Sequence, residues 1–190
     1  MIESILASGN VSAKLKLTVK TIISAGLTAL AVALPQIVHA FAGASGGMIW
    51  LPMYLPVILG GCLLGIRWGL GIGIASPLVS FLITSLAGSP MPAAARLPFM
   101  IAELAAMAVI SGLFTRLISK NSWMAFPAVL LAFVAGRSLF MLLAVIFQSV
   151  TPFTPALILS QIQSGLAGVV LQSVLIPAIV MLLGKLLEKE

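Results

Sequence analysis

Long apolar stretches, separated by short segments of small or polar residues, dominate the hydrophobic pattern of this chain. A helix needs about 20 apolar residues to cross a bilayer, and most of these stretches approach or exceed that length. The pattern predicts six membrane-spanning helices, with approximate bounds 17–38, 51–66, 68–86, 98–117, 123–147 and 156–186. We therefore expect an all-α integral membrane protein, a compact bundle of six transmembrane helices that forms a single domain over residues 1–190.

The composition leads to the same class. Of the 190 residues, 61% are hydrophobic and only 7% are charged, with a mean hydropathy of +1.24. Soluble domains carry about 25% charged residues, so this chain could not cover a water-facing surface. It has one cysteine, one histidine and no aspartate, which argues against a disulfide framework and against a metal site made by the protein alone. We expect no cofactor.

The basic residues predict the orientation of the bundle. With six spans, most lysines and arginines fall on one side of the membrane, and only Arg96 falls on the other. The residues on the basic side are Lys14, Lys16, Lys20, Arg67, Arg116, Lys120, Lys185 and Lys189. The positive-inside rule then predicts that both termini are cytoplasmic and that the segments 40–50, 87–97 and 148–155 are external. The stretch after Lys20 is long and five more follow, so we interpret it as an uncleaved first span instead of a signal peptide.

The segment 40–50 reads AFAGASGGMIW and carries no charge. We expect it to be a loop of small residues that folds over a small-molecule site at the outer face. It leads into LPMYLPVILGGCLLGIRW, an apolar segment that Arg67 ends.

Two ionisable residues lie well inside predicted spans, namely Glu103 and Arg137. At about 1.5 Å per residue, Glu103 lies roughly 10 Å and Arg137 roughly 15 Å below the outer surface. Charges at this depth usually face the bundle interior or a wet cavity. The two residues could form a buried pair that fixes helix packing. They could also bind a polar ligand, with Arg137 contacting an anion and Glu103 contacting a donor.

Other candidate ligand contacts lie at the same level. Trp50 and Tyr54 flank the start of the second span, where they could stack on a ligand or anchor the helix at the interface. His39 ends the first span. Gln161 opens a stripe with Gly165, Gly168 and Gln172, in which close helix packing is the simpler role and Gln161 the one plausible ligand contact.

Small residues also repeat every four positions. Ala25, Ala29 and Ala33 form one face of the first span, and Gly61, Gly65, Gly69 and Gly73 form a similar train across the second and third. Such spacing lets helices approach closely in a membrane. Each set could serve packing inside the bundle or present a flat docking face to another membrane subunit.

Two other functions compete with binding. The run from Gly43 to Gly46 has the GxSG pattern of rhomboid intramembrane proteases, with Ser45 as nucleophile, but the only histidine for a base is His39, six residues upstream. A self-contained channel or carrier is the second alternative, although no inverted repeat is evident. The chain lacks a phosphate-binding Gly-x-x-x-x-Gly-Lys-Ser/Thr loop, so ATP-driven work by that route needs a partner.

The six short spans, the alanine face and the small-residue segment before the second span resemble the substrate-binding S components of energy-coupling factor vitamin transporters. The runs LPMYLPVILGGCLLGIRWG, SPLVSFL, PFMIAEL and AGR are similar to a subgroup assigned to pyridoxine, hydroxymethylpyrimidine or cobalamin. The resemblance covers about residues 17–185.

This resemblance implies a binding subunit of a bacterial cytoplasmic membrane and no enzyme. Its implied partners are a transmembrane coupling subunit, two cytoplasmic ATPases and a vitamin-like small molecule, with no nucleic acid. The coupling subunit would contact Ala25, Ala29 and Ala33. The ligand residues implied by the family are Gly47, Met48 and Trp50 within 46–50, together with Glu103, Arg137 and Gln161.

Overall fold

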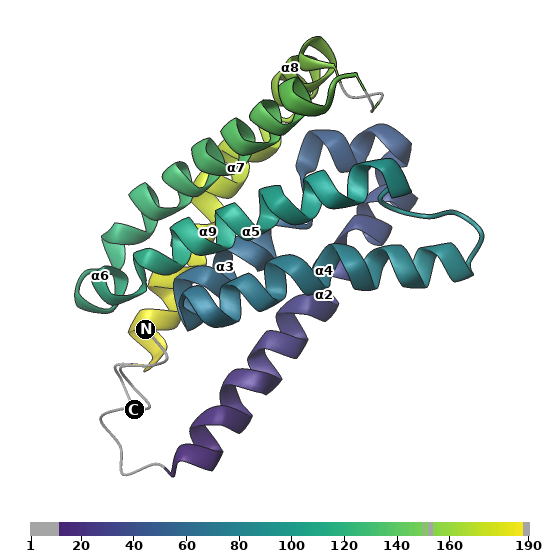
Figure 1. Cartoon of the computed structure of the whole chain (residues 1–190). Helices are drawn as coiled ribbons and strands as arrows, with labels where there is room; N and C mark the ends of the chain where they lie inside the picture. The colour runs from purple at the N-terminus through teal and green to yellow at the C-terminus, as the bar shows by residue number, and fades with distance from the viewer. Residues whose placement is uncertain (1–11, 150, 152–153, 188–190) are drawn as a thin grey trace.

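The computed structural model describes residues 12–149, 151 and 154–187, and every regular element among them is a helix (Figure 1). The elements are α2 (Ala13–Trp50), α3 (Tyr54–Leu64), α4 (Ile66–Leu86), η1 (Ala94–Arg96), α5 (Leu97–Leu113), α6 (Thr115–Lys120), η2 (Ser122–Met124), α7 (Ala125–Phe147), α8 (Pro155–Ser164) and α9 (Leu166–Leu187). Six helical segments of this described part are long and apolar enough to cross a membrane: Ala13–Gly43, Ser45–Leu64, Ile66–Leu86, Ala94–Lys120, Ser122–Phe147 and Leu166–Leu186. The predicted all-α architecture with six potential spans is confirmed.

The predicted loop over 40–50 is wrong. The segment is helical, and α2 continues to Trp50 with a break at Gly43, whose φ of 67° and ψ of −167° only glycine adopts readily. In an apolar environment a helix satisfies its own backbone groups, so small residues alone do not make a loop there. The second potential span therefore starts at Ser45, six residues earlier than predicted.

The junction between α2 and α3 is held by α9. Leu51 adopts a left-handed backbone conformation (φ 52°, ψ 47°), which costs a non-glycine residue about 1–2 kcal/mol. Gln172 offsets this cost, because its Nε2 donates to the carbonyl oxygens of Trp50 and Leu51, both at 2.8 Å. Gly168 lets α9 approach, since a Cβ there would meet the carbonyl carbon of Trp50 at 2.8 Å. The stripe on α8 and α9 thus serves close packing at its Gly168 and Gln172 positions.

The predicted sixth helix over 156–186 is two helices. Gly165 separates α8 from α9, and Thr154 caps the start of α8, because its hydroxyl accepts from the Leu157 amide at 3.2 Å. A Cβ at Gly165 would lie 3.2 Å from both the Met48 carbonyl oxygen and the Leu51 side chain. The chain therefore changes helix where it passes closest to the end of α2.

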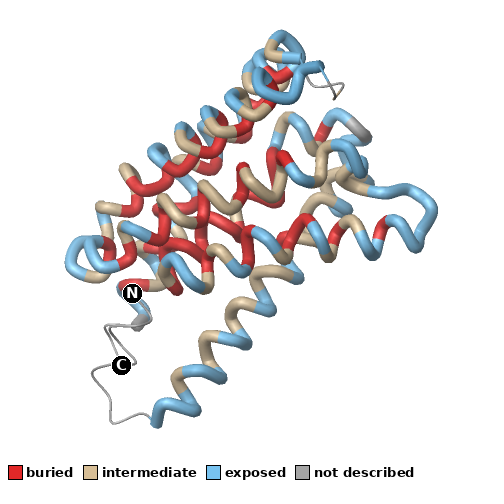
Figure 2. The backbone as a smooth tube through the Cα atoms, viewed as in Figure 1, coloured by how far each residue is buried: buried red, intermediate tan, exposed pale blue. Residues whose placement is uncertain are grey.

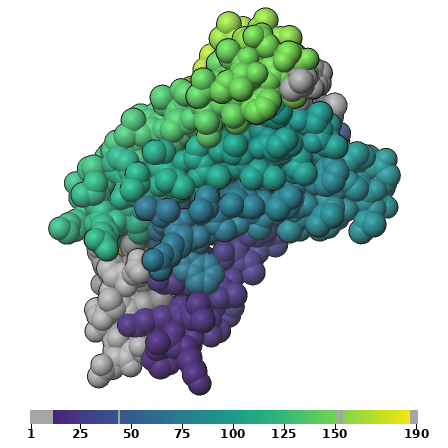
Figure 3. All heavy atoms as spheres, in the orientation of Figure 1, coloured from purple at the N-terminus to yellow at the C-terminus, as the bar shows by residue number. Residues whose placement is uncertain are grey.

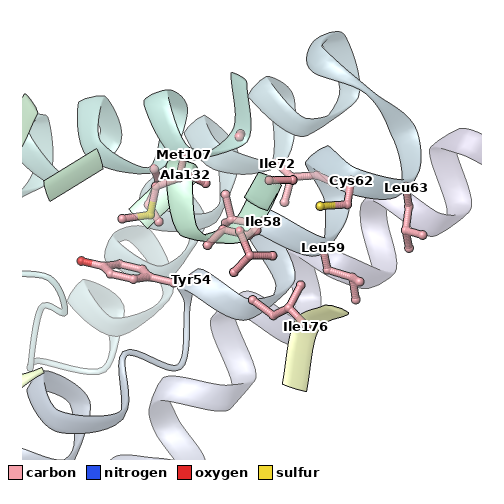
Figure 4. Packing of buried hydrophobic residues seen from close by; sticks show 14 of the residues in the cluster. Tyr54, Ile58, Leu59, Cys62, Leu63, Ile72, Met107, Ala132 and Ile176 are labelled. Atoms are coloured by element: carbon pink, nitrogen blue, oxygen red, sulfur yellow. The ribbon is translucent and has the colours of Figure 1, made fainter. Parts of the chain in front are cut away.

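The core surrounds α3, the most deeply buried helix (Figure 2). Figure 4 shows its side chains from Tyr54 through Ile58 to Leu63 among residues of other helices, such as Ile72, Met107 and Ile176. In the most apolar stretch of Ser45–Leu64, 72% of the residues are buried, against 6% in the corresponding stretch of α2. The first helix is thus an outer element.

The two small-residue trains differ in their surroundings. Gly61, Gly69 and Gly73 are buried, and a Cβ at Gly69 or Gly73 would meet the Gly61 Cα at 2.8 Å or the Leu104 carbonyl oxygen at 2.9 Å. This train therefore packs α3 and α4 closely against each other and α5. The side chains of Ala25, Ala29 and Ala33 are all exposed, and they form one face of α2 that the described residues leave uncovered.

The alternation of the helices gives the bundle two ends (Figure 1). We call one the basic end; it holds the start of α2, the α3–α4 turn, α6 and the end of α9. Its described basic residues are Lys14, Lys16, Lys20, Arg67, Arg116, Lys120 and Lys185. The other, the cavity end, holds the α2–α3 junction, the segment 87–96 and α8.

Gly69→Val should destabilise the bundle, because its added methyl groups have no room between α3 and α5. Overpacking of this kind costs about 1–3 kcal/mol or more. Gly71→Val is the matched control on the same helix, since a Cβ at Gly71 meets nothing within 4 Å. Thermal unfolding of both variants in one detergent measures the difference, and equal midpoints would contradict the packing described for α4.

Candidate functional site

A cavity of about 290 Å³ lies at the cavity end of the bundle. It is built from segments far apart in the chain, and its wall is mostly apolar with a few polar side chains. The lining residues are Pro35, His39, Gly47, Met48, Leu51, Pro52, Met53, Tyr54, Ser80, Met91, Pro92, Ala93, Arg96, Met100, Arg137 and Gln161. A concave apolar wall with few polar groups is typical of small-molecule sites, and this volume is at the small end of their range of about 300–1,000 Å³.

Hydrogen bonds fold the α4–α5 connection back onto α4 and so close one side of the cavity. The Thr84 hydroxyl accepts from the Met91 amide at 2.7 Å, and the Ser80 hydroxyl donates to the Met91 carbonyl at 2.8 Å. Thr84 also donates to the Ser80 carbonyl at 2.7 Å. Through these bonds two polar residues of α4 hold the segment that carries Pro92, Ala93 and Arg96 beside the cavity.

The Arg137–Glu103 pair lies in the inner part of the site. Arg137 Nη1 on α7 lies 2.9 Å from Glu103 Oε1 on α5, and their side chains are 10% and 1% exposed. Gly136 permits this approach, because a Cβ there would lie 3.2 Å from the Glu103 carbonyl oxygen. Arg137 borders the cavity, while Glu103 lies behind it and does not line it. Arg137 Nε and Glu103 Oε2 have no hydrogen-bond partner among the described residues.

Aromatic rings hold both arginines of the site. The Arg137 guanidinium carbon lies 5.0 Å from the centre of the Tyr54 ring, and that of Arg96 lies 5.5 Å from the centre of the Phe140 ring. Such cation–π contacts orient a guanidinium without neutralising it. Glu103 is the only acidic residue in the part of the chain that the structure describes. Two arginines therefore share one carboxylate, and the site has an excess positive charge.

The residues predicted from the sequence fall into three groups. His39, Gly47, Met48, Tyr54, Arg137 and Gln161 line the cavity. Glu103 does not line the cavity and lies behind Arg137, with which it forms the ion pair. Trp50 does not line it; its side chain is 43% exposed and its carbonyl is bound by Gln172.

Sequence reasoning missed Arg96 and three methionines, Met53, Met91 and Met100, as lining residues. Arg96 carried a signal, because it is the one basic residue predicted on the side opposite all the others. The methionines carried none, since an apolar residue in a span is expected in any case.

The serine of the GxSG pattern is exposed on α2, two residues after the helix break. In the described part of the chain, neither Ser45 nor His39 takes part in a side-chain hydrogen bond, so no base is joined to this hydroxyl. His39 lines the cavity, whereas Ser45 does not. The geometry brings together groups that bind and orient a molecule: two guanidinium groups, one amide and an aromatic ring.

Comparison of the chain with models of known protein families, with curated proteins and with solved structures finds no match.

The buried ion pair generates a stability prediction. Arg137→Met leaves the Glu103 carboxylate buried without its partner, and breaking such a pair costs about 3–5 kcal/mol. The double variant Glu103→Gln/Arg137→Met removes both charges and should recover a large part of that loss. Unfolding of the single and double variants in detergent gives the coupling free energy, and strictly additive costs would show that the pair does not interact.

Proposed function

We propose that this protein is a membrane subunit that captures a small molecule, of the S-component type found in energy-coupling factor vitamin importers. The single observation that carries the proposal is the cavity at one end of a six-helix bundle, lined by Arg96 and Arg137 and bordered by apolar side chains. In this function the protein binds its ligand and performs no chemistry on it. Delivery across the membrane would use a transmembrane coupling subunit and two ATPases.

The charge of the site supports a ligand with a strong hydrogen-bond acceptor. Guanidinium groups present planar sets of donors that match carboxylates and similar oxygens. Because Glu103 is the one carboxylate among the described residues and is paired with Arg137, a carboxylate or phenolate of the ligand would meet excess positive charge. Gln161 adds a buried amide oxygen, Oε1, without a partner among the described residues, which suits a donor on the ligand.

The size of the site supports a single-ring ligand. A cavity of about 290 Å³ accommodates a molecule of the pyridoxine or hydroxymethylpyrimidine type, with Tyr54 and the methionines against its ring. Cobalamin, with its corrin ring, is much larger than this space. Of the three vitamin classes that the sequence resemblance implies, the first two are therefore favoured.

The distribution of charge supports an external site and a cytoplasmic location of both termini. The described basic residues outside the bundle interior gather at the basic end, with Arg96 as the exception at the cavity end. In a bacterial cytoplasmic membrane this bias favours an orientation with the cavity on the outside. The uncovered alanine face of α2 offers a surface on which the coupling subunit could approach closely.

Arg96→Gln should weaken ligand retention about tenfold to a hundredfold, because a hydrogen bond to a charged group contributes about 1.5–3 kcal/mol. Mass spectrometry of molecules released from freshly purified protein, followed by titration of the identified compound, measures this loss. Lys120→Gln is the matched control, since it removes one positive charge at the far end of the bundle and should bind normally.

Two results would contradict the proposal. One is a released or titrated ligand that Arg96→Gln and the wild type bind equally well. The other is a wild-type protein that binds no member of a panel of single-ring vitamins and their precursors.

A further inference from the structure

A second hollow, of about 540 Å³, lies at the basic end and is separate from the proposed ligand site. It lies where α2, the α3–α4 turn and the α5–α6 junction meet. Its principal lining residues are Lys20, Gly65, Arg67, Trp68, Leu113 and Arg116. Figure 3 shows the N-terminal part of α2 projecting from the body of the molecule.

The basic side chains of this hollow come from three different segments. Lys20 belongs to α2, Arg67 to the start of α4 and Arg116 to α6. No carboxylate of the described residues lines the hollow, because Glu103 is the only one and it is paired with Arg137. Arg67 and Arg116 border the same space, where their like charges repel each other, and an anion between the two guanidinium groups would relieve that repulsion.

The surroundings of the hollow indicate the source of that anion. Arg67 and Trp68 stand at the beginning of one potential span, and Arg116 stands near the end of another, the level at which headgroups and tryptophan side chains meet. Ile66 and Leu113 also line the space and are 37% and 56% exposed. Exposed aliphatic side chains beside arginines suit a molecule that has both a phosphate and acyl chains.

We propose that the hollow beside Arg67, Trp68 and Arg116 binds the phosphate-bearing headgroup of an anionic phospholipid. The guanidinium groups of Arg67 and Arg116 hold the phosphate through charge-assisted hydrogen bonds. Trp68 lies at the headgroup level, and the acyl chains follow Ile66 and Leu113. Basic pockets between membrane helices are known to hold anionic headgroups. A lipid held here contacts both α2 and α4, and so stabilises the position of the outermost helix.

Native mass spectrometry of the detergent-purified full chain tests this site. Short-chain phosphatidylglycerol and phosphatidylcholine are added separately, and retained lipid adducts are measured for the wild type, Arg67→Gln, Arg116→Gln and the double variant. The wild type should retain one phosphatidylglycerol at least tenfold more strongly than phosphatidylcholine. Each single variant should weaken that adduct, and the double variant should lose it.

Lys14→Gln/Lys16→Gln is the matched control, because it removes two charges from α2 outside the hollow and should retain the lipid. Arg67 and Arg116 are exposed, so we expect the single variants to fold, and they test the proposal even if the double variant does not fold.

Equal binding of the two lipids by the wild type would overturn the proposal. Acidic side chains of another protein would then be the alternative partners of these cations. Loss of the adduct on adding inorganic phosphate at low millimolar concentration would also overturn it, since the hollow would then bind free phosphate. Equal loss of the lipid adduct in the Lys14→Gln/Lys16→Gln control would also contradict the proposal, because the lipid would then respond to the total positive charge of the protein and not to this hollow.

Discussion

The ion pair between Arg137 and Glu103 constrains how α5 packs against α7. Neither charge can face lipid without a large free-energy cost, so both must point into the bundle and remain within contact of each other. The close approach at Gly136 satisfies this requirement. Because Arg137 is only partly enclosed, the same constraint also brings a guanidinium group to the wall of the cavity.

The remaining wall depends on breaks in helices. Gly43 interrupts α2, Leu51 reverses the chain in a left-handed conformation, and Gly165 divides α8 from α9. Gln172 joins α9, the helix that follows Gly165, to the α2–α3 junction at Leu51 through its hydrogen bonds to the Trp50 and Leu51 carbonyl oxygens. A bundle of unbroken helices would fill its interior with side chains. The breaks let segments with Met48, Met53 and Gln161 surround a space instead.

Much of the fold followed from the sequence, since an apolar stretch of membrane length has few alternatives to a helix. The boundaries near glycine were harder to predict. The segment 40–50 contains three glycines, yet only Gly43 breaks the helix, because the surrounding apolar phase favours continued backbone hydrogen bonding. The split at Gly165 depends on its contact with Met48 and Leu51, which are more than 110 positions away, and no local pattern encodes such a contact.

For the site, intramembrane charge was the informative signal. Glu103 and Arg137 stand out in any apolar span, and the structure brings them together. Trp50 illustrates the opposite case, because an aromatic residue near the membrane surface can face lipid as easily as a ligand. The position of Arg96 depends on how Ser80 and Thr84 fold the segment before it, so its approach to the cavity required the three-dimensional arrangement.

The most direct test of the account is an experimental density map of the purified protein with the small molecule that it retains. We predict density for that molecule between Arg96 and Arg137, with its acceptor group toward the guanidinium groups and its ring beside Tyr54. Density at another place on the molecule, or a ligand that contacts neither arginine, would contradict the assignment of this cavity as the binding site.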